Sequence, residues 1–180
     1  MAKHPVPNVP FVEAKRKGNK HKPTAIVLRA SFTPSTQGAA LEIARYWHRD
    51  AQTDACHYVV DSGSTYRCIP DGVSSLMGAA LQNGTIWVNL CCEPNEDKEL
   101  FFKSTGPNLL DRAADLVAEL CLSHKIRPVK LSRNEQGKWY MWKRRSRGGV
   151  IINIEGAFPS KEFMDTVRWK IRQREVNRHE

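Results

Sequence analysis

Histidine, carboxylate and cysteine side chains carry most enzymatic proton transfer and metal binding, and in this chain they are scattered. The sequence contains 6 histidines and 5 cysteines. The histidines in predicted helices, His48 and His124, have no second histidine and no carboxylate at the spacing that would share a metal. The cysteines are odd in number and form no C-x-x-C pair, so we predict small buried side chains instead of disulfides or a zinc knuckle.

The stretch from Cys56 to Asp71 is the most informative part of the chain. Its composition predicts a strand over 57–60 and another over 65–69, joined by small, turn-prone residues. His57 heads the first strand, where a hydrogen-bonded core imidazole is the favoured interpretation and a metal ligand or binding residue the alternative. Tyr58 is interpreted in the same way. No nucleophile elbow accompanies either residue.

Apolar periodicity places these residues in a layered α/β domain with one central sheet. Residues 1–23, rich in Pro, Lys and Gly, are expected to form an extended basic N-terminal arm, and residues 24–180 the domain itself. In the first helix, either Tyr46 or Trp47 belongs to the apolar stripe. The other predicted elements are strands at 25–28, 85–92 and 150–154 and helices at 38–49, near 109–121 and from 160 onward.

Length and composition agree with one compact domain. The chain has 180 residues, of which 41% are hydrophobic and 26% charged. No run approaches the roughly 18 apolar residues that a membrane span requires, and the first residues lack the apolar core of a signal peptide. We therefore expect synthesis in a cytoplasm and no membrane partner.

Positive charge is concentrated in two segments. Lys and Arg number 28 against 19 Asp and Glu, which gives a formal net charge of +9. The clusters lie at 15–22 and 143–147, where they can meet nucleic acid or another polyanion, although solvated loops are the commoner explanation. The aromatic and basic segment 138–147 is either a stacking surface or an edge element of the sheet. Its candidate binding residues are Trp139, Trp142, Arg144 and Arg145.

The order of several short motifs resembles the type 2 N-acetylmuramoyl-L-alanine amidases, the family of phage endolysins and peptidoglycan recognition proteins. The motifs cover most of the chain, at 23–28, 43–48, 57–61, 66–71 and 157–159. The resemblance implies a mixed central sheet flanked by helices and a catalytic zinc held by three protein ligands, with water in the fourth position. It also implies a peptidoglycan substrate and a phage context.

The residues at the implied zinc and cleft positions depart from the family pattern. The first zinc ligand aligns with Arg29, which has no lone pair to offer a metal. A cleft histidine aligns with Leu76, and a strand glutamate with Asn89. The second ligand aligns with either Arg133 or Asn153, depending on the placement chosen.

The third ligand normally precedes the Ala-Phe-Pro motif, where only Glu155 can coordinate a metal. These departures favour a non-catalytic amidase-like module without zinc or another cofactor. Such a module would bind peptidoglycan or another phage structural protein. If it is a virion component, the module itself would be incorporated in the phage particle. One alternative is an active zinc amidase with a rearranged site that includes His57 or Glu155. Another is a polyanion or nucleic-acid binder.

Overall fold

The computed structural model describes residues 9–31, 33, 36–77, 84–93, 95, 97, 99, 101, 105, 107–131, 148–154 and 156–177. Of the sequence-based candidates, Arg133, Trp139, Trp142, Arg144, Arg145 and Glu155 lie outside these residues. Among the described residues, no helix combines the length and the apolar character needed to cross a membrane.

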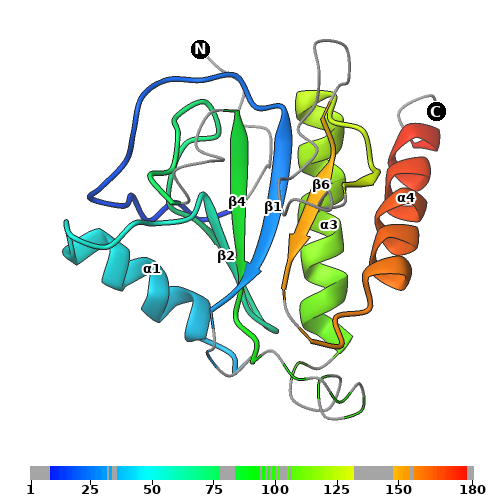
Figure 1. The fold of residues 1–180 in the computed structure, drawn as a ribbon, viewed down its shortest axis with the longest axis horizontal. Helices are drawn as coiled ribbons and strands as arrows, with labels where there is room; N and C mark the ends of the chain where they lie inside the picture. Colours follow the sequence, from blue (N-terminus) through cyan, green and yellow to red (C-terminus); the bar gives the residue numbers. More distant parts are fainter. Residues whose placement is uncertain are drawn as a thin grey trace, which may run out of the picture.

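The described residues form one mixed sheet with helices on both faces (Figure 1). The elements in chain order are β1 (Ala25–Ala30), α1 (Ala39–Arg49), β2 (Tyr58–Val60), β3 (Thr65–Arg67), β4 (Thr85–Leu90), α3 (Pro107–His124), β5 (Lys130–Leu131), β6 (Val150–Asn153) and α4 (Ser160–Val176). The strand order is β3-β2-β4-β1-β6-β5, and only the β2–β3 pair is antiparallel. The predicted α/β fold with a central mixed sheet is confirmed.

Alternation along the strands divides the core into two layers, because successive strand side chains point to opposite faces. On β1, Ile26 and Leu28 join the larger cluster, which packs against α3 and α4. Val27, between them, joins the smaller cluster under α1. Within α1, Trp47 is 6% exposed and Tyr46 is 54% exposed, so Trp47 is the residue of the apolar stripe.

The β2–β3 hairpin is joined to the start of α1 by a single carboxylate. Oδ2 of Asp61 accepts hydrogen bonds from the backbone N–H groups of Gly38 and Ala40, both at 2.9 Å. Its Oδ1 accepts from the backbone N–H groups of Gly63 at 2.8 Å and Ser64 at 2.6 Å. The helix has no side-chain cap of its own, so Asp61 provides one from a distant part of the sequence.

The N-terminal segment, residues 9–23, pairs first with the β3 edge of the sheet and then with the loop that follows β3. The N–H of Val12 donates to the carbonyl of Arg67 at 2.9 Å, and the N–H of Arg67 donates to Pro10 at 2.9 Å. Further along, the N–H of Gly18 donates to Ser74 at 2.7 Å. Ala14 is 1% exposed and belongs to the core under α1. This part of the segment therefore covers an edge that would otherwise be open.

All five cysteines are buried and free, as the sequence predicts. Burial raises the pKa of the Cys92 and Cys121 thiols to about 12. These side chains therefore remain protonated near neutral pH and act as small apolar groups.

Candidate functional site

The sheet brings three of the sequence-based candidate residues together at the carboxyl ends of its central strands. Arg29 on β1 is the register partner of Asn89 on β4 and of Asn153 on β6. Neighbouring strands lie about 4.8 Å apart, so the three residues form a continuous row. Ligands of open α/β sheets bind at this end of the strands.

The row lies on the face of the sheet that α1 covers. Two residues earlier on the same strands, Val27, Trp87 and Ile151 all belong to the cluster under α1. Because side chains two apart on a strand share a face, Arg29, Asn89 and Asn153 point to this same side. Asn89 is 1% exposed, whereas Arg29 is half-buried and Asn153 is exposed.

The guanidinium of Arg29 has weak acceptors for its five N–H donors. Its Nη1 donates to the Sδ of Met77 at 2.7 Å, and its Nε donates to the carbonyl of Ala30 at a long 3.4 Å. A thioether sulfur is a poor acceptor. None of the carboxylates in the described part of the chain forms an ion pair with Arg29.

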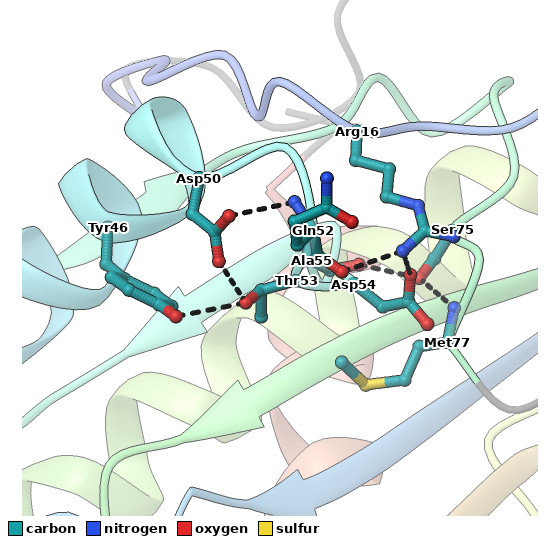
Figure 2. Close-up of polar contacts among 9 residues, drawn as sticks. All are labelled: Arg16, Tyr46, Asp50, Gln52, Thr53, Asp54, Ala55, Ser75 and Met77. Carbon is teal, nitrogen blue, oxygen red and sulfur yellow. Dashed lines mark hydrogen bonds and ion pairs between the residues drawn. The ribbon is translucent and has the colours of Figure 1, made fainter.

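Met77, which contacts Arg29, lies in a loop that Ser75 fixes by hydrogen bonds (Figure 2). The Oγ of Ser75 donates to the carbonyl of Ala55 at 2.6 Å and accepts from the N–H of Met77 at 3.0 Å. Cys56 lies beside them, with its Sγ 3.5 Å from the Sδ of Met77. The resemblance aligns Leu76 with a histidine of the family's cleft, but Met77 is the residue that contacts Arg29. Leu76 is half-buried and lies close to Gly18.

Two buried N–H donors on β4 have no hydrogen-bond partner among the described residues. They are the Nδ2 of Asn89 and the indole Nε1 of Trp87. Trp87 is 5% exposed and lies two residues before Asn89, on the same face as Arg29. Buried polar atoms are nearly always satisfied in native proteins, so two such donors beside a guanidinium call for an explanation.

These side chains do not suit the zinc ion that the resemblance to type 2 amidases implies. A protonated guanidinium cannot coordinate a cation, and zinc prefers imidazole, thiolate or carboxylate ligands to the amides of Asn89 and Asn153. Across the described residues, no group of three or more His, Cys, Asp or Glu could hold a metal. The nearby thiol of Cys56 has its pKa raised to about 12 by burial, against the opposing charge of Arg29.

His57 is fully buried, and backbone groups occupy both of its ring nitrogens. Its Nδ1 accepts from the N–H of Trp87 at 3.0 Å, and its Nε2 lies 2.8 Å from the carbonyl of Val73, to which it donates. Burial lowers the pKa of His57 to about 4, although the contact with Val73 and the charge of Asp71 oppose the shift. With both nitrogens engaged, this imidazole has no lone pair free for a metal or substrate.

Tyr58 points into the other core layer and belongs to a small polar network. Its hydroxyl donates to Oδ1 of Asp71 at 2.6 Å, and burial together with the charge of Asp71 raises its pKa. The Nε2 of His124 lies 2.7 Å from Oδ2 of Asp71. Asp71 is 4% exposed, so the network links β2 to the end of α3 inside the protein. It does not include the Arg29 row.

The described part of the N-terminal basic cluster has local partners. Nη1 of Arg16 donates to the carbonyl of Gln52 at 2.7 Å and lies 3.2 Å from Oδ1 of Asp54 (Figure 2). Lys17 forms an ion pair with Glu13. These two basic side chains therefore already have partners within the protein, which a polyanion would have to replace.

The comparisons with known proteins find similarity in structure alone. No family model and no curated protein matches the sequence. A mutant endolysin from Bacillus subtilis matches with a TM-score of 0.58 at 17% identity, covering 91% of this chain and 98% of that one. The Staphylococcus aureus hydrolase AmiA, in complex with its ligand, gives a TM-score of 0.61 at 14% identity, with 92% and 84% covered.

A third match comes from Clostridium intestinale URNW. Its endolysin LysCS, an N-acetylmuramoyl-L-alanine amidase, gives a TM-score of 0.59 at 13% identity and covers 91% of this chain and 97% of that one. These similarities extend over nearly the whole chain. The chain therefore has the fold of the type 2 amidases to which these endolysins belong.

Proposed function

We propose that this chain is a non-catalytic module of the amidase fold and that it binds peptidoglycan. The observation that supports the proposal is the row of Arg29, Asn89 and Asn153 at the strand ends, where the resemblance implies zinc ligands and a glutamate. Without zinc chemistry, the side chains at these strand ends remain available for binding. The structural matches, named as endolysins and an amidase, suggest peptidoglycan as the ligand.

A phage particle is the setting that we propose for this module. An amidase-like domain without zinc would serve there by attaching the particle to the cell wall or by contacting another structural protein. Its buried cysteines and the absence of disulfides among them suit a protein that is made in a reducing cytoplasm.

The test measures zinc content and wall cleavage on the same purified chain, with the S. aureus hydrolase as a positive control. After dialysis against trace zinc, we expect no retained metal, because the described donor set offers zinc no suitable ligands. Purified sacculi should bind the chain and release no peptide, with or without a chelator. About one tightly held zinc per chain, together with chelator-sensitive cleavage, would overturn the proposal.

The net charge of +9 favours one alternative, a polyanion binder. Binding through phosphate-type contacts weakens steeply with salt, because counterions are released on association. We expect sacculus binding to persist when the salt concentration is raised several-fold. Binding that collapses with salt and transfers to DNA would favour the alternative.

A further inference from the structure

We propose that Arg29, Asn89 and Trp87 form a binding site for a carboxylate group. The inference rests on the proposed function, since it identifies the ligand chemistry of the same strand ends. It begins from two buried N–H donors on β4 that have no partner among the described residues, the Nδ2 of Asn89 and the Nε1 of Trp87. On the neighbouring strand, the guanidinium of Arg29 donates only to a thioether sulfur and, at 3.4 Å, to a backbone carbonyl among the described residues.

The three side chains share one face of two neighbouring strands. Arg29 and Asn89 are register partners on neighbouring strands, about 4.8 Å apart. Trp87 is two residues from Asn89 on the same face, a rise of about 7 Å along β4. Two unpaired N–H donors next to a strand that carries one positive charge are complementary to a single acceptor-rich anion.

The charge and shape of the site favour a carboxylate over a phosphate. A guanidinium offers two parallel N–H groups that match the two oxygens of a planar carboxylate. One cation and two neutral donors balance one negative charge, whereas a phosphate carries nearly two. Half-burial of Arg29 strengthens the pairing, because water screens a partly buried charge less.

The surroundings of Arg29 suit the apolar body of such a ligand. Met77, which touches its Nη1, and Cys56, which touches Met77, present sulfur and carbon atoms to the site. Both residues are packed with the core under α1. An N-acylated amino acid with a free carboxyl end has both parts, a planar anion and a small apolar side chain. We therefore assign this class of ligand to the site.

The test titrates the full chain with N-acetyl-alanine and with its neutral amide, following heat release and tryptophan fluorescence. We expect saturable binding of the acid and none of the amide. Arg29→Gln should weaken binding by at least about tenfold, because hydrogen bonds to charged groups contribute that much. Arg45→Gln removes an equal charge from the exposed face of α1 and should bind as the parent chain does.

A second variant keeps the test decisive if Arg29→Gln fails to fold. Asn89→Asp is nearly isosteric and places a carboxylate beside Arg29, so it should abolish ligand binding while preserving the fold. Equal binding of acid and amide, binding unaffected by either variant, or tighter Arg29-dependent binding of inorganic phosphate would each overturn the carboxylate assignment. Absence of binding by every probe would also overturn the carboxylate assignment.

Failure of this inference is distinguishable from failure of the proposed function. A zinc-free chain that binds sacculi but ignores N-acetyl-alanine refutes the carboxylate site alone. Retained zinc and cleavage refute the proposed function. If both proposals hold, sacculi whose peptide carboxylates have been converted to amides should bind the chain at least about tenfold more weakly than untreated sacculi.

Discussion

At the scale of single residues, the contacts of His57 explain why an imidazole lies at the centre of this domain. The neutral ring both accepts and donates, so it joins the N–H of Trp87 to the carbonyl of Val73 inside the core. Protonation would place a hydrogen on Nδ1, facing the N–H of Trp87. Burial lowers the pKa to about 4, because the charged ring would remain desolvated. The charged ring would also lose the hydrogen bond from Trp87.

This lowered pKa predicts a loss of stability in acid. Between about pH 6.5 and pH 4 the unfolded chain binds a proton at His57 and the folded chain does not. The free energy of unfolding therefore decreases as the pH is lowered through this range. The shift corresponds to about 3 kcal/mol between neutral pH and pH 4. Denaturant unfolding of the parent chain at several pH values measures the effect.

A pair of histidine variants isolates this contribution. His57→Gln keeps one acceptor and one donor without titrating, so its stability should depend less on pH across this range. His48→Gln alters an exposed ring on α1 and should retain the pH dependence of the parent. The same slope in both variants would show that groups other than His57 cause the acid sensitivity.

At the scale of elements, the position of α1 depends on Asp61 at the end of β2. The carboxylate accepts from four backbone N–H groups, two at the start of the helix and two in the hairpin turn. These hydrogen bonds lower its pKa, although burial opposes the shift. One residue therefore fixes both the hairpin and the first turn of the helix that covers the Arg29 face.

Removal of this carboxylate should destabilise the domain strongly. Asp61→Ala leaves several buried donors without partners, and we expect a loss of about 3 kcal/mol in the free energy of unfolding. Asp165→Ala removes an exposed carboxylate whose ion pairs with Lys161 and Arg168 lie on the surface, and its effect on stability should be much smaller. Chemical denaturation of the three chains compares these values, and similar losses in both variants would contradict the capping role.

At the scale of the whole molecule, the N-terminal segment acts as a cover for the sheet. Residues 9–23 satisfy backbone groups of β3 and of the loop that follows it, and Ala14 fills part of the core under α1. The loop they contact continues to Met77, which lies over Arg29. The segment thus contributes to the domain and indirectly supports the candidate site.

Two truncations test this contribution. Deletion of residues 1–8 leaves every described contact intact and serves as the reference for the longer deletion. Deletion of residues 1–23 removes the hydrogen bonds along Arg67 and Cys68 and the buried Ala14, so the thermal midpoint should fall by about 5 °C or more. Equal midpoints for the longer deletion and the parent chain would show that the segment merely rests on the surface.

Much of the fold could be predicted from the sequence, because the apolar patterns are local. The run at 25–28 and the stripe from Leu109 to Cys121 correspond to β1 and α3, and the order of motifs predicted the mixed sheet. The two-residue strand β5 was missed, since Lys130–Leu131 is too short to show a period. The cap from Asp61 was missed because it acts on a helix 21 residues away.

For the candidate site, the sequence by itself determined which residue types stand at the aligned positions, above all an arginine that cannot bind a metal. Only the tertiary structure decided that Arg29, Asn89 and Asn153 are register partners, because strand pairing joins residues far apart in the chain. The tertiary structure also added two residues to the candidate site. Met77 contacts Arg29, and Trp87 has a buried indole N–H without a partner among the described residues. Such properties arise only when distant segments exclude water from one another.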